Sequence, residues 1–309
     1  MITVEHLSKT YGERLAVDDI SFKIEQGEIV GFLGPNGAGK TTTMRAITGY
    51  LMPTEGEVWV ADCNMRKDPL KARQHIGYLP ETIPLYTDMT TRAYLKFAAR
   101  LRGLDSKIAQ RRIDEVVDVC QLQEYCDVLT GKLSKGFRQR VGLAQAIIHD
   151  PDVLILDEPT VGIDPLQVVQ TKEMIKELGR KRTILLSTHI LPEVSLICER
   201  VIIINQGKIV AEDSIDNLSK FLNKRKQLRL RINGPAEQVI ERLSKIEALL
   251  EVTYQEPYYL LEFEKSKQPQ AEVNQVLAQE GWTLFAMEEI EMSLEEIFVK
   301  LTRDSEEEL

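Results

Sequence analysis

The sequence predicts an α/β protein with a largely parallel, buried sheet, followed by a small α+β unit. Short β-branched runs alternate with helical patterns as far as about residue 205, which is typical of a parallel sheet covered by helices. A basic stretch at residues 220–231 then marks a change of composition and is expected to be a solvated linker. A chain of 309 residues is also longer than the chains that usually fold around a single hydrophobic core. Two domains are therefore expected.

The strands of the large unit are expected at EIVGFLG, VLILDEP, TILLSTH and VIIIN. Between IGYLP, at residues 76–80, and residue 129 the hydrophobic pattern changes. TRAYLKFAARLRGL and RRIDEVVDVCQLQEY have apolar residues at helical spacing. This segment is expected to be a helical insert. NQGKIVAED at 205–213 predicts a hairpin with Gly207 in its turn, which closes the large unit.

The small unit shows the order strand, helix, strand, strand, helix, strand. Its segments are LRLRING, AEQVIERLSKI, LLEVTYQE, YYLLEFEK, QAEVNQVLAQEG and WTLFAMEEIE. This order favours a ferredoxin-like fold. A last helix is expected at SLEEIFVKLT, where Leu294, Ile297, Phe298 and Leu301 share one face.

Charge and composition exclude several classes of protein. A net charge of −9 argues against nucleic-acid binding, which needs clustered cations. The start of the chain has no basic segment followed by an apolar one, and the aliphatic runs are too short to span a bilayer, so a cytoplasmic protein without a membrane span is expected. The cysteines lack metal-ligand spacing and are expected to be reduced thiols: Cys63, Cys120, Cys126 and Cys198.

The stretch FLGPNGAGKTTTMRAI fits the phosphate-loop pattern G-x-x-x-x-G-K-[ST], and it follows a predicted strand and opens a helix, as that loop requires. Lys40 is expected to reach the β and γ phosphates of a nucleotide, and the Thr41 hydroxyl to bind Mg²⁺. Backbone N–H groups and the helix dipole supply the remaining positive field. The expected nucleotide-binding residues of this loop are Gly34, Pro35, Asn36, Gly37, Ala38, Gly39, Lys40, Thr41 and Thr42.

Two further strands are expected to end at the same edge of the sheet. VLILDEPT delivers Asp157, which we expect to hold Mg²⁺ through water, and Glu158, which we expect to orient and deprotonate the attacking water. TILLSTHI delivers His189, whose place suits a hydrogen bond to the γ phosphate or to the attacking water. The other three histidines are expected to be structural.

A second anion-binding turn lies in LTGKLSKGFRQRVGLAQAI, at residues 129–147. Together with the phosphate loop, the Asp-Glu pair and His189, it resembles the nucleotide-binding subunits of ATP-binding-cassette (ABC) transporters over roughly residues 1–215. The resemblance implies a P-loop NTPase cassette with an antiparallel β subdomain and a helical subdomain at about 82–135. The expected domains are 1–218 for the cassette and 219–309 for a C-terminal α+β accessory domain.

The same resemblance implies that two cassettes pair head to tail, so that each caps the ATP held by the other. The Ser134 hydroxyl, the Gly136 N–H and the positive helix end would then form half of an anion site that is complete only in the dimer. Asp164, in VGIDP, corresponds to the acidic residue that crosses the interface, and His189 to the switch histidine of the family. Tyr11 corresponds to the aromatic that stacks on adenine, and an ordinary loop-edge aromatic is the alternative.

Three residues depart from the family pattern. Glu81 stands where glutamine is usual; it can still offer oxygen to Mg²⁺ but has no amide donor, and at this position it would link the magnesium and water site to the membrane partner. Phe137 replaces a usual glutamine and cannot hydrogen-bond to ribose. Lys135 replaces a usual glycine, and its cation either strengthens the grip on the nucleotide of the partner or points to solvent.

The function implied by the resemblance is that of an ATP-hydrolysing subunit that needs ATP and Mg²⁺. Such a subunit dimerises, most simply as a homodimer, and drives a separate integral membrane permease, with export as the expected direction. The chain would then lie at the inner face of the cell membrane through that permease. A cytoplasmic helix of the permease is expected to dock around Pro84, Leu85, Tyr86, Met89 and Tyr94.

Two other functions remain open. A cassette ATPase of DNA repair or translation would use the same motifs, although such proteins usually carry a long coiled-coil insertion, a tandem cassette or an iron-sulfur domain. A P-loop kinase would use the phosphate loop alone and would need neither the second turn nor Asp164 nor His189.

Overall fold

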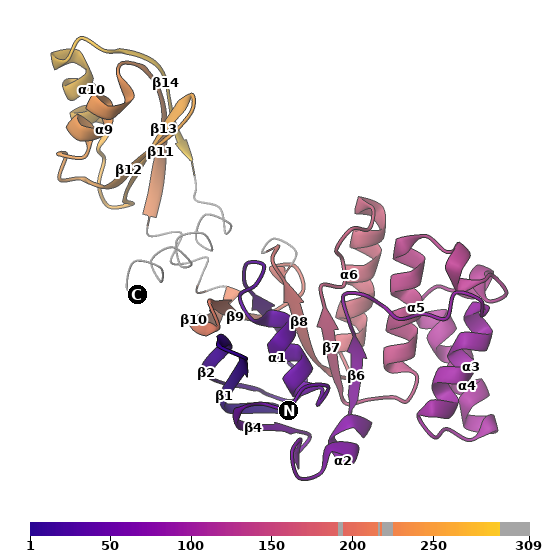
Figure 1. Ribbon diagram of the computed structural model, residues 1–309. Coiled ribbons are helices and arrows are strands. Elements are labelled where there is room, and N and C mark those ends of the chain that lie inside the picture. Colours follow the sequence, from indigo (N-terminus) through magenta and orange to yellow (C-terminus); the bar gives the residue numbers. More distant parts are fainter. Residues whose placement is uncertain (191–193, 216, 218–224, 291–309) are drawn as a thin grey trace. The chain divides into compact units, whose positions relative to one another are not determined.

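The computed structural model describes residues 1–190, 194–215, 217 and 225–290 (Figure 1). The chain divides into two compact units, of which one is Met1–Asp213 and the other begins at Ser214. The predicted boundary between residues 218 and 219 falls outside the described residues and stays a prediction. The predicted helix SLEEIFVKLT also lies outside them.

The large unit is built on a six-stranded sheet with the order β10-β9-β3-β8-β7-β6. The pairs that join β9, β3, β8, β7 and β6 are parallel. The strands are β3 (Ile29–Leu33), β6 (Ile76–Leu79), β7 (Val153–Asp157), β8 (Thr183–Thr188), β9 (Arg200–Asn205) and β10 (Lys208–Ser214). Every residue of β7 and β8 is buried, because both faces of the sheet are covered. The predicted parallel sheet is confirmed.

A two-residue turn joins β9 and β10, and Gln206 and Gly207 both have a positive φ there, of 46° and 84°. Such a turn matches the twist of the strands that it connects. The predicted hairpin is therefore present, with Gly207 at its turn.

A second, antiparallel sheet with the order β2-β1-β4-β5 accompanies the first one. Its strands are β1 (Ile2–Tyr11), β2 (Arg14–Ile24), β4 (Glu55–Val60) and β5 (Cys63–Asn64). Helix α1 (Lys40–Ile47) lies between the two sheets (Figure 1). Met44 and Ile47 of this helix belong to one core cluster with residues of both sheets. The implied antiparallel subdomain is confirmed, and it fixes the helix that follows the phosphate loop.

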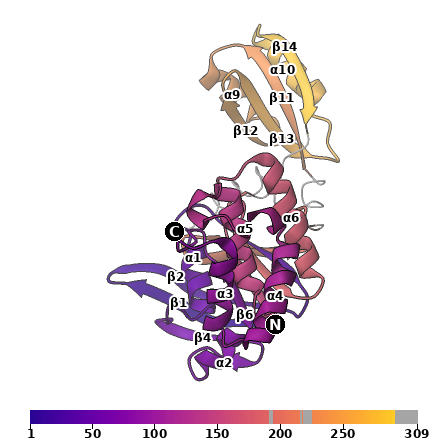
Figure 2. The ribbon, with the colours of Figure 1, turned by 90° about the vertical axis from the view of Figure 1, so that its right-hand side faces the viewer.

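The predicted helical insert consists of α3 (Thr91–Leu101) and α4 (Ser106–Val119), followed by the short 3-10 helices η1 (Gln123–Tyr125) and η2 (Thr130–Lys132). It leads into α5 (Lys135–Ile147), which packs against α3, α4 and β6 (Figure 2). The remaining helices of the unit that the structure describes are α2 (Pro69–Gln74) and α6 (Pro165–Gly179). No helix in the described ranges is long and apolar enough to cross a membrane.

The second unit contains β11 (Arg225–Asn233), α9 (Ala236–Leu243), β12 (Leu249–Gln255), β13 (Tyr258–Glu264), α10 (Gln270–Gln279) and β14 (Thr283–Ile290). Its sheet has the order β12-β13-β11-β14, and each adjacent pair is antiparallel. Val239 and Leu243 of α9, with Val273 and Leu277 of α10, form the core against the sheet. This confirms the predicted ferredoxin-like fold.

Candidate functional site

The phosphate loop connects β3 to α1 and is shaped by two glycines. Gly39 precedes α1 with φ of 111°, a conformation that side chains other than glycine rarely adopt. A Cβ at Gly34 would lie 2.4 Å from the carbonyl oxygen of Ile204 in β9. The backbone can therefore curl closely around the start of the helix, where its N–H groups face an anion.

Lys40 is folded back over the loop. Its Nζ donates to the carbonyl oxygens of Gly34, at 2.7 Å, and Pro35, at 3.2 Å. It also lies 3.4 Å from Oε1 of Glu158, and both side chains are almost fully buried. Lys40 and Glu158 are more than one hundred residues apart in the sequence, yet their side chains form an ion pair in the fold. The loop is held in shape before any phosphate arrives.

Asp157, at the end of β7, lies next to the start of α1. Ser187 Oγ donates to its Oδ1 at 2.5 Å. Burial raises the pKa of Asp157, whereas the Ser187 hydrogen bond and the nearby Thr41 hydroxyl act in the opposite direction. Its Oδ2 is buried and has no hydrogen-bond partner among the described residues. An oxygen-rich point with one orphaned carboxylate oxygen fits Mg²⁺ with its water ligands.

Glu158 occupies the sharp turn after β7, with φ of 49°, in the left-handed region. Its N–H is held by the carbonyl oxygen and Oγ of Ser187, at 3.2 and 3.1 Å. Nδ1 of His189 lies 3.0 Å from its Oε2 and 3.1 Å from its Oε1. The carboxylate therefore stands between one cation, Lys40, and one imidazole. Such backbone strain is typical of functional positions.

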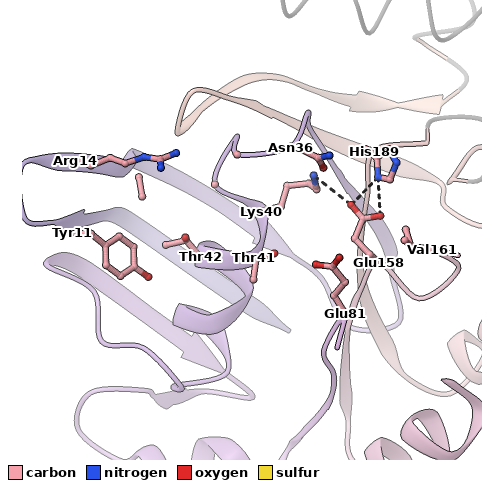
Figure 3. A pocket seen from close by; sticks show the side chains of 13 residues that line it. Tyr11, Arg14, Asn36, Lys40, Thr41, Thr42, Glu81, Glu158, Val161 and His189 are labelled. Atoms are coloured by element: carbon pink, nitrogen blue, oxygen red, sulfur yellow. Dashed lines mark hydrogen bonds and ion pairs between the residues drawn. The ribbon is translucent and has the colours of Figure 1, made fainter. Parts of the chain in front are cut away.

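Lys40, Glu158 and His189 line one cleft of about 640 Å³, whereas Asp157 is buried and does not line it (Figure 3). Its other walls come from β1, β2 and the Glu81 loop, and Figure 3 shows the Glu81 side chain between Thr41 and Glu158. Tyr11 lies at the opposite end and is 46% exposed, which leaves its ring available for stacking. The lining residues are Tyr11, Arg14, Ala16, Asn36, Gly37, Gly39, Lys40, Thr41, Thr42, Glu81, Glu158, Val161 and His189.

Four residues at the site were missed by sequence reasoning. Arg14, Ala16 and Val161 line the cleft, and Ser187 bridges Asp157 and the N–H of Glu158. Ser187 lies two residues before His189 in the predicted strand, and this position could have indicated that Ser187 belongs to the site. Its register opposite Asp157 is a property of the folded sheet.

Ser134, Gly136 and Asp164 do not line this cleft. Ser134 is the N-cap of α5, where its Oγ accepts from the N–H of Phe137 at 3.4 Å. Asp164 is the N-cap of α6, where Oδ1 accepts from the N–H of Gln167 at 3.1 Å. The structure thus separates the predicted nucleotide-binding residues into two groups within one chain.

Two departures from the family pattern have intrachain partners. Phe137 stacks against Tyr125 with ring centroids 3.8 Å apart, and the Arg140 guanidinium lies 5.2 Å from its ring centre. Lys135 points toward Gly162, since a Cβ on that glycine would lie 2.3 Å from Lys135 Nζ. Phe137 is thus half-buried within the chain, and Lys135 is exposed beside Gly162.

Comparisons with known proteins agree with this geometry. The family model described as "ABC transporter" matches residues 17–161. The bacitracin transport ATP-binding protein of Bacillus licheniformis is 34% identical and is aligned over 97% of each chain. The linearmycin resistance ATP-binding protein of Bacillus subtilis is 31% identical over 98% of each chain. A dimeric bacterial ABC transporter cassette superimposes with a TM-score of 0.64 at 26% identity, over 70% of this chain and 99% of its own. The chain therefore belongs to the ABC transporter family, as an ATP-binding subunit that uses Mg²⁺ and hydrolyses ATP.

Proposed function

We propose that two copies of this chain close around two MgATP molecules at the inner face of the cell membrane and drive export through a separate permease. A transport ATPase of this family works as a dimer with a membrane permease. For this chain we propose in addition that the dimer is a homodimer and that the transported molecule is drug-like and is exported. The similarity to the bacitracin transport and linearmycin resistance proteins, which covers nearly the whole of each chain, supports the transport of a drug-like molecule. The observation that carries the proposal is the buried Lys40–Glu158 ion pair in the cleft, with the more exposed His189 imidazole beside the same carboxylate.

Within the cleft, Lys40 and the loop N–H groups would bind the phosphates, and Thr41 with Asp157 would hold Mg²⁺, which supplies charge neutralisation on the phosphates. Glu81 would offer a further oxygen there. Glu158 would accept a proton from the attacking water. His189, within hydrogen-bond reach of that carboxylate, would orient it or the γ phosphate.

Ser134, Gly136 and Asp164, which do not line the cleft of their own chain, would act on the ATP held by the partner copy. Ser134 and Gly136, at the N-terminus of α5, would face the γ phosphate held by the other chain, and Asp164 would lie at the same interface. None of these three residues lines the cleft of its own chain, which supports this division. Tyr11 would stack on the adenine at the far end of the cleft.

For the permease we propose a docking surface beside the Glu81 loop. Tyr86 is 52% exposed and rests edge-on against Phe97 of α3, with ring centroids 5.3 Å apart. Tyr94, however, is only 3% exposed, and its hydroxyl donates to Gln145 Oε1 at 2.7 Å. The expectation that Tyr94 meets the permease is wrong, because this side chain is part of the core of the insert.

A separate cavity of about 380 Å³ lies near the end of α3. Arg73 donates to the carbonyl oxygen of Gly49 at 2.8 Å, and Arg102 to that of Arg73 at 3.1 Å. Tyr50 is 78% exposed at its edge. No carboxylate lines the cavity, which therefore suits the acidic or carbonyl-bearing end of a helix.

The decisive test is Glu158→Gln. This variant should bind MgATP and accumulate as an ATP-dependent dimer, while hydrolysis falls about 100- to 10,000-fold because the water loses its base. Size-exclusion chromatography with ATP and a phosphate-release assay measure both results. Glu173→Gln, at an exposed glutamate of α6, is the control. Near-normal turnover in Glu158→Gln would remove this residue from the base role.

The docking surface is tested by the double variant Tyr86→Asp, Met89→Asp. It should lose the membrane protein that co-purifies with the wild-type chain and retain basal ATPase activity. Ile108→Asp, at an exposed apolar position of α4, serves as the control. Co-purification at the wild-type level would rule out this docking surface.

A further inference from the structure

Arg14 lines the ATP cleft from a part of the chain that carries neither the phosphate loop nor the strand-end carboxylates. It is the first residue of β2, and the register between β1 and β2 pairs it with Tyr11 across a tight turn. Directly opposed residues of an antiparallel pair project from the same face of the sheet. Figure 3 accordingly shows both side chains at the end of the cleft opposite Glu158, with the Arg14 guanidinium directed toward the phosphate loop.

The guanidinium of Arg14 lies beside the tip of that loop. A Cβ built on Gly37 would be 3.9 Å from Arg14 Nη2. Gly37 and Gly39 have φ of 84° and 111°, and left-handed residues of this kind let successive N–H groups of a loop form one anion-binding concavity. Arg14 therefore lies between the Tyr11 ring and this concavity. With adenine stacked on Tyr11, the phosphates nearest the ribose would pass through this part of the cleft.

Arg14 is also the cation of the cleft whose charge no described carboxylate offsets. Among lysine, arginine and acidic side chains, the cleft is lined by Lys40 and Arg14 and by Glu81 and Glu158. Lys40 already lies 3.4 Å from Glu158. Figure 3 shows Glu81 next to Glu158, away from Arg14. Arg14 itself is exposed and forms no ion pair with any residue that the structure describes. An arginine is always charged at neutral pH, so this end of the cleft attracts an anion.

We propose that Arg14 is a nucleotide-binding residue whose guanidinium binds oxygens of the α and β phosphates. The proposal rests on the proposed function, in which Tyr11 stacks on adenine and Lys40 binds the phosphates on the side of Glu158. The planar fork of a guanidinium matches two oxygens of a phosphate group, which a single ammonium does not. Two directly opposed side chains of one hairpin thus recognise the two chemically different halves of the nucleotide: Tyr11 the base, and Arg14 the charged chain.

A role in folding, or a role at the base, leads to different expectations. Arg14 lies in an exposed turn, where a substitution usually changes the unfolding free energy little. A guanidinium that acted on the base through its π system would change the affinity for a nucleoside without phosphates. A guanidinium that binds phosphate changes the affinity only for ligands that carry phosphate. The two halves of ADP therefore separate these roles.

The test uses the full chain at low concentration with Mg²⁺ and measures ADP, adenosine and inorganic pyrophosphate as competitors of a fluorescent ADP analogue. Arg14→Ala should weaken the binding of ADP and of pyrophosphate about 5- to 20-fold at low salt, between the usual effects of an exposed ion pair and of a hydrogen bond to a charged group. The affinity for adenosine and the thermal midpoint without nucleotide should stay unchanged.

Two further measurements identify the charge and the fork. Higher ionic strength should reduce the difference between the wild type and Arg14→Ala, because salt screens an exposed contact. Arg14→Lys should recover part of the ADP affinity, since it keeps the charge without the second donor. A full loss in Arg14→Lys, equal to that of Arg14→Ala, would contradict a contact that depends on charge.

Arg66→Ala is the matched control, because it removes an exposed arginine of the same unit that does not line the cleft. An equal loss of ADP affinity in Arg66→Ala would show that only the net charge of the chain matters, and would overturn the proposal. Unchanged pyrophosphate affinity in Arg14→Ala, or an equal loss for adenosine, would overturn it as well. If the wild type bound neither ADP nor ATP, the proposed function itself would fail.

Discussion

The starts of helices α1 and α5 differ in what surrounds them. Both begin after a glycine-containing or serine-capped turn and expose backbone N–H groups to an anion. At α1, one chain brings together Lys40, Asp157, Glu158 and His189. At α5, the N–H of Phe137 is the only hydrogen-bond partner of the Ser134 Oγ in the part of the chain described. The α1 site can bind phosphate within one chain, and the α5 site needs a second chain.

This difference separates what a monomer should do from what a dimer should do. Changes at α1 should be felt by an isolated chain, and changes at α5 should appear only when two chains meet. The effect of Ser134→Arg is expected to be the largest. Nucleotide affinity of the monomer should change less than about twofold, whereas the ATP-dependent dimer should be lost, because the bulky cation fills the space of the half-site.

Size-exclusion chromatography with ATP, in the Glu158→Gln background, measures the effect of Ser134→Arg. Ser134→Thr keeps the hydroxyl cap and is the control. If the Ser134→Arg variant formed a normal dimer, the start of α5 would not be needed for ATP-dependent dimerisation, and the contrast with α1 would fail.

Lys40→Ala should act on the monomer itself. Loss of the cation should weaken MgATP binding about 10- to 100-fold, the usual range for a hydrogen bond from a charged group. Titration of the dilute chain with a fluorescent ATP analogue checks this value, with Lys96→Ala on the exposed side of α3 as the control. If only dimer formation suffered, α1 would not be the complete site described above.

Ser187→Ala should have a smaller effect on the same cleft. The change removes the donor to Asp157 and one acceptor of the Glu158 N–H, so the carboxylates are less well positioned. We expect the hydrolysis rate to fall about 10-fold, and the unfolding free energy by about 1 to 3 kcal/mol, because two buried groups lose a partner. Phosphate release and urea denaturation measure the two values. Unchanged hydrolysis would show that Ser187 acts only in folding.

Phe137→Leu should have the smallest effect. It keeps an apolar side chain and removes the stacking on Tyr125, which should lower the unfolding free energy by about 0.5 to 1.5 kcal/mol and leave ATP binding unchanged. Tyr125→Leu should cost a similar amount, and the double variant less than the sum, as denaturant titrations can measure. A clear loss of ATP affinity in Phe137→Leu would instead place residue 137 at the nucleotide.

Much of this architecture follows from local patterns. Uninterrupted aliphatic runs predicted β7 and β8, since a strand that is buried on both faces has no polar side. The small unit was predicted in its order of strands and helices because each segment has one clear period. The position of Tyr94 could not be predicted in this way, because an aromatic side chain at helical spacing can face the core or a partner.

The sequence by itself determined the chemistry: a glycine-rich loop with Lys40, two carboxylates and a histidine at strand ends, and a second serine-capped turn. These features depend on residue type and short spacing, which are local. Only the tertiary structure decided which of them meet, because the register between β7 and β8 places Ser187 opposite Asp157. In the same way, the packing of α5 against the loop before α6 places Lys135 on Gly162. Contacts between distant segments depend on how the whole chain packs, and no local pattern contains that information.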